Sequence, residues 1–396
     1  MKTLTRWESN EAMNPLERKI AGKIKDEGPI TFETFMKMAL YEPGLGYYSS
    51  DRIEIGKAGD YYTSQHLHPV FGAMLGKQLE EMWKIMGRPS VFYAVEPGAG
   101  EGYMCHDILQ FLNDKDIYAA LNYVIVEPHP FMKGKQKKLL DRYTDKIAWS
   151  SSLKELKEFK GCILSNELFD AFPVHLIEME DELKEIYVAA ENDLFTELRL
   201  PPGTQALAGY LEEFSIQLPP GFRTEINLGI KDWLREAGEV LSEGFILTID
   251  YGHPAREYYS EERNRGALLC YHKHQLSENP YQYVGEQDIT AHVNFSSVKK
   301  WGEEYGFKTL GFCSQGAYLV SLGIDEIIAE LYRNSKDYLF ELAKIKRLIL
   351  PGTIGETHKV LIQHKGAVVP ELSGFKIKNQ KHKLNEDRQD EKTNYR

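Results

Sequence analysis

A short glycine-rich stretch carries the clearest chemical signal in the chain. An apolar run that begins at Val91 ends in Glu96, and three glycines follow at alternate positions, Gly98, Gly100 and Gly102. A strand that stops at such a loop and restarts as a helix offers backbone N–H groups to a ligand, and glycines let that ligand lie against the main chain. The dinucleotide fingerprint needs a further glycine at position 103, which is a tyrosine here. The pattern therefore favours S-adenosylmethionine over NAD; a purely structural tight turn is the alternative.

Two further segments are candidates for the same cofactor. Glu127 ends the apolar run that starts at Tyr123. In nucleotide-binding sheets an acid at this place accepts hydrogen bonds from both ribose hydroxyls, although it can also be an ordinary solvated strand end. Residues 56–64 are rich in glycine, tyrosine and hydroxyl groups, which suits a loop that folds over a small ligand. We place Asp60 and Thr63 among the cofactor contacts; a structural loop pinned by aromatic rings is the alternative.

A polar cluster follows the apolar run 161–165. It contains Asn166, Glu167 and Asp170. In an open parallel sheet the reaction centre lies outside the carboxyl ends of the strands, so these side chains are expected to face the reacting group. The alternative is that Asn166 and Asp170 cap the turn and the helix after it.

Histidines give weaker signals. Asp288 and His292 are four positions apart, which on a helix would make an acid–imidazole pair able to take up a released proton. A helix cap beside a buried histidine is the alternative. Two His-x-His pairs, at 66/68 and 272/274, have no carboxylate or cysteine cluster beside them, so we expect no metal site.

Alternating strand and helix patterns must position these residues. We expect strands at 91–97, 123–127, 161–165 and 244–250 with helices between them, which is typical of a doubly wound α/β domain. We divide the chain into an N-terminal helical cap and aromatic loop (1–90), a main domain (91–365) with an insertion at about 174–240, and a disordered charged tail (366–396). The insertion is expected to contain a hairpin, and Thr31 is expected to cap a helix.

Composition limits the broad class. With 396 residues and 42% hydrophobic content, the chain can bury a sizeable core. A net charge of −11 argues against non-specific nucleic-acid binding. The four cysteines lie far apart and are expected to be buried thiols in a reducing compartment. No apolar run reaches membrane-spanning length, and the N-terminal residues do not resemble a signal or transit segment, so we expect a cytoplasmic, prokaryotic location.

Five segments, taken together, resemble one known family in the same order along the chain. They are Gly59-Asp60-Tyr61-Tyr62-Thr63-Ser64, Glu96-Pro97-Gly98-Ala99-Gly100-Glu101-Gly102, Asn166-Glu167-Leu168-Phe169-Asp170-Ala171-Phe172-Pro173-Val174, Gly285-Glu286-Gln287-Asp288-Ile289-Thr290-Ala291-His292-Val293 and Pro351-Gly352-Thr353-Ile354-Gly355-Glu356. On these segments, residues 27–363 resemble the MidA-like methyltransferases. Family members often have a Leu-Gly-Pro-Gly-Arg-Gly type of loop. The loop here differs in sequence but keeps every glycine.

The resemblance implies a class I, Rossmann-type sheet, S-adenosylmethionine as cofactor and methyl transfer to an arginine side chain of a protein. The eukaryotic member is a mitochondrial assembly factor of respiratory complex I that symmetrically dimethylates an arginine of a quinone-site subunit. A complex I-type subunit is therefore the implied partner, and a homodimer is left open.

An arginine acceptor gives the polar cluster a specific role. Because a guanidinium stays protonated in proteins, carboxylates must bind it. Glu167 and Asp170 are suited to accept paired hydrogen bonds from it. Asn166 could then orient either partner. Two alternatives stay open, namely methylation of a small molecule or another side chain, and a non-catalytic cofactor-binding assembly chaperone.

Overall fold

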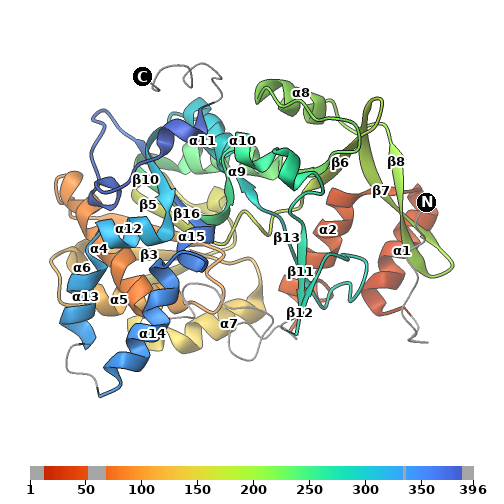
Figure 1. Ribbon diagram of the computed structural model, residues 1–396. Helices are drawn as coiled ribbons and strands as arrows, with labels where there is room; N and C mark the ends of the chain where they lie inside the picture. The colour runs from red at the N-terminus through yellow and green to blue at the C-terminus, as the bar shows by residue number, and fades with distance from the viewer. Residues whose placement is uncertain (1–12, 52–67, 274, 333–335, 386–396) are drawn as a thin grey trace, which may run out of the picture.

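One central sheet organises the molecule (Figure 1). The computed structural model describes residues 13–51, 68–273, 275–332 and 336–385. The strand order is β15-β16-β10-β5-β2-β3-β4. The bounds are β2 Phe92–Pro97, β3 Leu121–Val126, β4 Ile147–Ser150, β5 Phe159–Asn166, β10 Leu241–His253, β15 Lys308–Ser314 and β16 His358–Lys365. Strands β10, β5, β2, β3 and β4 are parallel, and β16 runs antiparallel to both of its neighbours. The short strand β14 (Val293–Asn294) pairs with the end of β10.

Helices cover both faces of this sheet. Neighbouring strand residues point to opposite faces, so Ala94 belongs to one buried core and Val95 to the other. The first face carries α4 (Val70–Ile85), α5 (Tyr103–Leu112), α6 (Ile117–Ala120), α12 (Gln315–Ser321), α13 (Ile324–Tyr332) and α14 (Tyr338–Ile349). The second face carries α8 (Ala206–Glu213), α9 (Gly229–Val240) and α11 (Phe295–Glu304). Shorter helices are α7 (Pro130–Leu139), α10 (Ala255–Tyr258) and α15 (Ile354–Thr357). The expected doubly wound α/β domain is confirmed.

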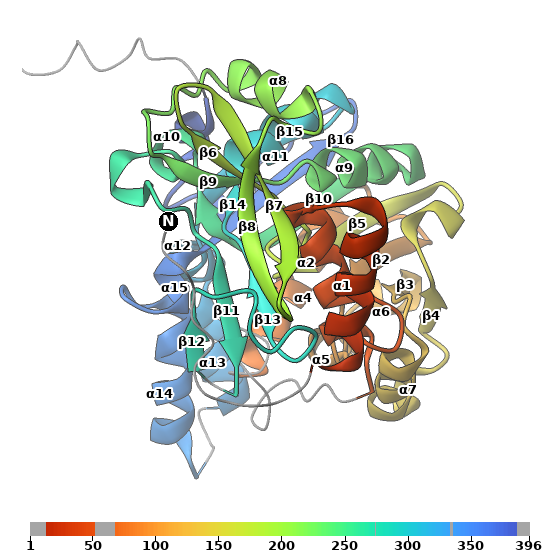
Figure 2. The ribbon, with the colours of Figure 1, turned by 90° about the vertical axis from the view of Figure 1, so that its right-hand side faces the viewer.

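A second sheet combines the N-terminus with the insertion. Its members are β1 (Ile30–Thr31), β7 (Leu183–Glu191), β6 (His175–Met179), β9 (Arg223–Ile226) and β8 (Leu194–Leu200). The hairpin expected in the insertion is β6–β7, and β1 pairs with β7. Helices α1 (Pro15–Glu27) and α2 (Phe32–Tyr41) share a third core with this sheet. Figure 2 shows α1 and α2 beside β7 and β8. The side chain of Thr31 accepts from the backbone of Thr34 and caps α2, as expected.

A three-stranded sheet lies near this unit and contains one of the candidate residues. Its strands are β11 (Leu269–His272), β12 (Gln275–Ser277) and β13 (Asp288–Thr290), in the order β12-β11-β13.

Two expectations about the ends of the domain are wrong. Helix α4 packs against α5 on the central sheet, so it does not belong to an N-terminal cap that extends to residue 90. Residues 366–385 are not a disordered tail, because Leu372, Phe375 and Leu384 are buried in the two central cores. Three apolar side chains among many charged ones were sufficient for packing.

The remaining global expectations concern thiols and membranes. All four cysteines, Cys105, Cys162, Cys270 and Cys313, are buried free thiols, as expected. None of the helices in the described ranges is long and apolar enough to cross a membrane.

Candidate active site

The glycine loop joins β2 to α5. Gly98, Gly100 and Gly102 have φ angles of 69°, 52° and 94°, a region that glycine adopts without steric cost. The N–H of Gly98 donates to the Val126 carbonyl at 3.3 Å, and that of Gly102 donates to the Ala99 carbonyl at 2.9 Å. Two backbone hydrogen bonds, one to β3 and one within the loop, therefore hold the loop in place. A Cβ atom at Gly98 would lie 2.8 Å from Cδ1 of Leu168, so this glycine also allows the segment after β5 to approach closely.

The two acids next to the loop are both buried. Glu96 is 1% exposed and accepts a 2.5 Å hydrogen bond from the Tyr123 hydroxyl. Burial raises the pKa of Glu96 to about 7, although this bond favours the charged form. Burial also raises the pKa of Glu127, whose carboxylate accepts from the His129 backbone at 2.8 Å and from the Gln136 side chain at 3.2 Å. Glu127 lies directly after β3, the neighbour of β2 in the sheet.

A tight turn after β5 carries the predicted polar cluster, and Asp250 of β10 holds it in place. One oxygen of Asp250, Oδ2, accepts from the backbone N–H groups of Leu168, Phe169 and Asp170 at 3.2, 2.9 and 3.4 Å. Burial and the charge of Glu167 nevertheless raise the pKa of Asp250 to about 7. The fully buried carboxylate of Asp250 therefore fixes the backbone conformation of the turn.

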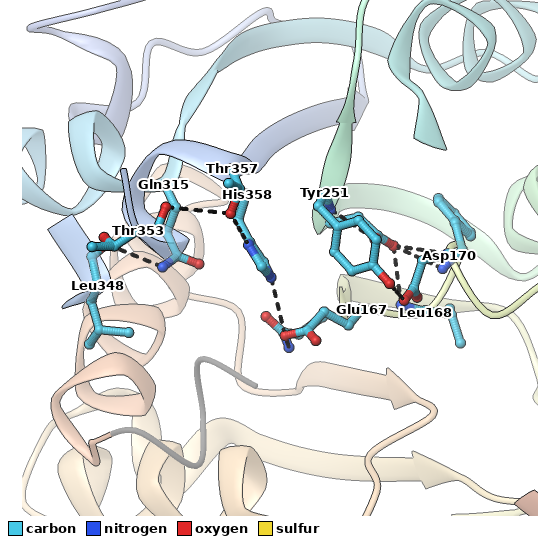
Figure 3. A network of polar contacts seen from close by, with 12 residues as sticks. Glu167, Leu168, Asp170, Tyr251, Gln315, Leu348, Thr353, Thr357 and His358 are labelled. Carbon is cyan, nitrogen blue, oxygen red and sulfur yellow. Dashed lines mark hydrogen bonds and ion pairs between the residues drawn. The ribbon is translucent and has the colours of Figure 1, made fainter. Parts of the chain in front are cut away.

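Glu167 adopts a left-handed backbone conformation, with φ of 50°, which is uncommon for a residue with a side chain. Figure 3 shows its carboxylate pointing toward His358, the first residue of β16. Oε1 lies 3.4 Å from Nε2 of His358 and accepts from the Asn166 amide at 3.1 Å. Such backbone conformations are often found at active sites.

Asp170 is the third acid of this cluster, and its pKa is raised as well. It is 4% exposed, and Oδ2 accepts a short hydrogen bond from the Tyr251 hydroxyl (Figure 3). Burial and the charges of Asp250 and Glu167 raise its pKa well above the usual range. Oδ1 of Asp170 and Oδ1 of Asn166 have no hydrogen-bond partner among the described residues. None of the lysines and arginines in the described ranges pairs with Glu167, Asp170 or Asp250. The cluster therefore has acceptors and negative charge in excess.

The structure does not give Asp288 and His292 the helical spacing expected for a pair. Asp288 opens strand β13, and its Oδ1 accepts from the Tyr48 hydroxyl at 2.7 Å. The ring of His292 instead packs against Tyr251 and His253, at centroid distances of 5.4 and 5.5 Å. Burial lowers the pKa of His292 to about 3, which leaves a neutral, weakly basic imidazole near neutral pH. Both residues therefore lie near the cluster but contact different partners. Tyr251, which packs against His292, also donates a hydrogen bond to Asp170, and the charge of Asp288 acts on Asp170.

The N-terminal unit reaches the site through two tyrosines. Besides Tyr48, which donates to Asp288, the hydroxyl of Tyr41 donates to the carbonyl of Ala171 at 2.8 Å. Asp60 and Thr63 lie outside the described residues, as do His66 and His274. His68 contacts the Val70 backbone and Glu341, away from the acidic cluster.

The predictions omitted Asp250, His358 and Gln136 from the site. Asp250 ends an apolar run, as Glu96 and Glu127 do, so the same signal could have identified it. His358 and Gln136 had no comparable signal, because they meet their partners across 191 and 9 to 36 residues of sequence.

Comparison with known proteins defines the class. Residues 74–313, more than half of the chain, match the family model described as "Putative S-adenosyl-L-methionine-dependent methyltransferase". The chain belongs to this family, as the resemblance implied. With its sheet, its glycine loop and the acid after β3, it is an S-adenosylmethionine-dependent methyltransferase of the α/β class.

Individual relatives are similar over most of their length. The chain is 26% identical over 395 residues to "Protein arginine methyltransferase NDUFAF7 homolog, mitochondrial" from Drosophila melanogaster, covering 91% of this chain and 87% of the relative. It is 27% identical to the human protein arginine methyltransferase NDUFAF7, with 82% and 77% covered. A crystal structure of a COG1565 superfamily member and likely methyl transferase from Burkholderia thailandensis, bound to S-adenosyl-homocysteine, is 27% identical with a TM-score of 0.85, and 94% and 100% of the two chains are covered.

The residues around the loop fit S-adenosylmethionine. Three glycines at positive φ form the loop, and α5 begins at Tyr103 after the N-cap residue Gly102, without a side-chain cap on its first N–H groups. Glu127, held by two donors, lies at the end of the adjacent strand. When bound, the cofactor supplies an electrophilic methyl group on a sulfonium.

Proposed function

We propose that this chain methylates an arginine side chain of a protein, with a complex I-type subunit as the substrate. The observation that carries the proposal is the group formed by the buried Asp170 and Asp250 and the partly buried Glu167, which is paired with none of the described lysines or arginines. A guanidinium remains protonated in proteins and forms paired hydrogen bonds with carboxylates. It would supply the missing positive charge and the missing donors.

Each residue then has a role in binding the acceptor. Glu167, oriented by Asn166 and His358, would hold one edge of the guanidinium. Oδ1 of Asp170 would accept a hydrogen bond from a second N–H of the guanidinium, while Oδ2 accepts from the Tyr251 hydroxyl. The positive charge of a bound guanidinium would oppose the raised pKa of Asp170 and keep it ionised, and this carboxylate could then take up the proton that the guanidinium nitrogen loses after methylation. Holding the acceptor nitrogen in line with the methyl group can lower the barrier by about 7–11 kcal/mol.

Position in the fold supports the same reading. Leu168, in the centre of the polar segment, faces Gly98 of the cofactor loop. The proposed acceptor site and the proposed cofactor site, which includes Glu96, Gly98, Gly100, Gly102 and Glu127, are therefore adjacent. Relatives named protein arginine methyltransferases support an arginine acceptor.

The experiment compares complex I-type subunits by mass spectrometry in cells with and without this gene. We expect one methylarginine to disappear on deletion and to return with the intact gene but not with Asp170→Asn. Unchanged methylarginines, together with label from methyl-labelled S-adenosylmethionine only in small molecules, would refute the proposal. Gly100→Val provides a second check, because complex assembly that survives loss of cofactor binding would indicate a non-catalytic chaperone.

A further inference from the structure

Gln136 of α7 contacts both parts of the proposed cofactor site. Its Nε2 donates to the carbonyl of Gly100 at 2.8 Å and to Oε2 of Glu127 at 3.2 Å. The side chain is completely buried. One amide group therefore joins the glycine loop to the acid after β3.

Trp149 of β4 determines which way this amide points. Its Nε1 lies 3.0 Å from Oε1 of Gln136. An indole N–H can only donate, so the amide oxygen must face Trp149 and the NH₂ group must face Gly100 and Glu127. If the amide were flipped, its NH₂ group would face the indole N–H of Trp149, and its oxygen would face the acceptors of Gly100 and Glu127, so these hydrogen bonds would be lost.

Without this amide, the partly buried carbonyl of Gly100 and the buried carboxylate of Glu127 would have no donor between them. The two acceptors would then repel each other, and among the described residues the His129 backbone would still donate to Glu127. A buried acceptor that loses its donor costs more than an ordinary hydrogen bond contributes.

We infer that Gln136 is a positioning residue for S-adenosylmethionine, which fixes the spacing between the glycine loop and the carboxylate of Glu127, and that Trp149 fixes Gln136. The inference rests on the proposed ribose-binding role of Glu127. It is independent of the identity of the methyl acceptor.

Isothermal titration with S-adenosylhomocysteine tests this inference. We expect Gln136→Leu to weaken binding by about tenfold or more, since a buried hydrogen bond to a charged group is lost. Trp149→Phe keeps the amide but frees it to rotate, and should weaken binding by about two- to fivefold. Gln110→Leu on α5 is the matched control, because Gln110 is exposed and its amide oxygen accepts from Arg142; the affinity of this variant should stay unchanged. An affinity of Gln136→Leu within about twofold of the wild type would overturn the inference.

A double-mutant cycle with Glu127→Ala separates positioning from a general structural effect. If Gln136 acts through Glu127, Gln136→Leu should cost little additional affinity in the Glu127→Ala background. Fully additive losses would refute this route. If Gln136→Leu does not fold, Trp149→Phe replaces it in the cycle with Glu127→Ala. Unchanged affinity of Trp149→Phe for S-adenosylhomocysteine would then overturn the inference. Wild-type affinity in Glu127→Ala alone would instead refute the proposed role of Glu127.

Discussion

Three carboxylates lie together at the end of β5, where Glu167 and Asp170 belong to the turn and Asp250 of β10 holds it. Backbone N–H groups hold Asp250, a tyrosine hydroxyl holds Asp170, and an amide and an imidazole hold Glu167. These partners orient the side chains, while burial and the repulsion between the acids raise the pKa values of Asp170 and Asp250. At the scale of the residue, the site is therefore built to gain from a positively charged ligand.

Asp170→Asn tests the role of this charge. We expect methyl transfer to arginine to fall at least about 100-fold, because both a charged acceptor and a proton acceptor are lost. Affinity for S-adenosylhomocysteine should change little, since Asp170 belongs to the acceptor side. Asp114→Asn is the control, because the side chain of Asp114 is 78% exposed. A coupled assay and calorimetry on the same samples measure both effects; equal activity of the two variants would contradict the assignment.

Glu96 gives a pH-dependent prediction. Its pKa is raised from 4.5 to about 7 on folding, so the native state binds more protons than the unfolded state between these pH values. Its contribution to stability therefore falls as the pH rises from about 4.5 to 7. Glu96→Gln should match the wild type near pH 4.5 and be more stable above pH 7, by up to roughly 3 kcal/mol. Its amide oxygen can still accept from Tyr123.

Urea unfolding of the ligand-free protein at pH 5 and pH 8 measures this difference. Glu158→Gln, at an exposed position, is the control and should show no such change. A difference between Glu96→Gln and the wild type that stays constant across this range would contradict the buried, protonated carboxyl group.

At the scale of the element, the loop between β2 and α5 is defined by backbone conformations that residues with side chains avoid. Gly98 has the additional constraint of Leu168, which lies in contact range of any added Cβ atom. The loop thus holds the cofactor segment and the acceptor segment close together. A change at Gly98 should affect both.

Gly98→Ala is expected to weaken S-adenosylhomocysteine binding by about tenfold and to destabilise the protein by about 1–2 kcal/mol, because a positive φ is unfavourable for alanine. Gly134→Ala in α7 is the control, since nothing lies within 4 Å of the added methyl group. That variant should be neutral or up to about 1 kcal/mol more stable. Calorimetry and urea unfolding measure both. Wild-type binding by Gly98→Ala would show that the loop tolerates a side chain.

At the scale of the whole molecule, segments that are far apart in the chain pack together into common sheets and cores. The N-terminal strand β1 extends the sheet of the insertion, and Tyr48 of the same unit contacts Asp288 near the acidic cluster. Residues 366–385 close the opposite end, where the ring of Phe375 packs over Gly311 and against Tyr318. The last described residues are therefore part of the domain.

Phe375→Ala should destabilise the protein by about 3–5 kcal/mol, because it leaves a cavity over Gly311. Ile377→Ala is the control, since Ile377 is 67% exposed and should cost less than about 0.5 kcal/mol. Urea unfolding compares the two. Equal stability would mean that this segment is not packed on the core.

The sequence alone determined the local features of this protein. Apolar runs that end in Glu96 and Glu127, the spacing of three glycines and the polar residues after β5 depend on neighbours within a few positions, and so does the cap at Thr31. These patterns were sufficient to predict the α/β class of the domain and the cofactor.

Only the tertiary structure decided which side chains meet there. The contacts of His358 with Glu167, of Gln136 with Gly100, and of β1 with β7 join residues far apart in the chain. They depend on how both faces of the sheet pack, and no local pattern encodes that. The same reason explains the three wrong expectations. Asp288 lies in a strand because that strand pairs with β11, α4 belongs to the main domain because it packs against α5, and residues 366–385 are ordered because a few of their side chains are buried.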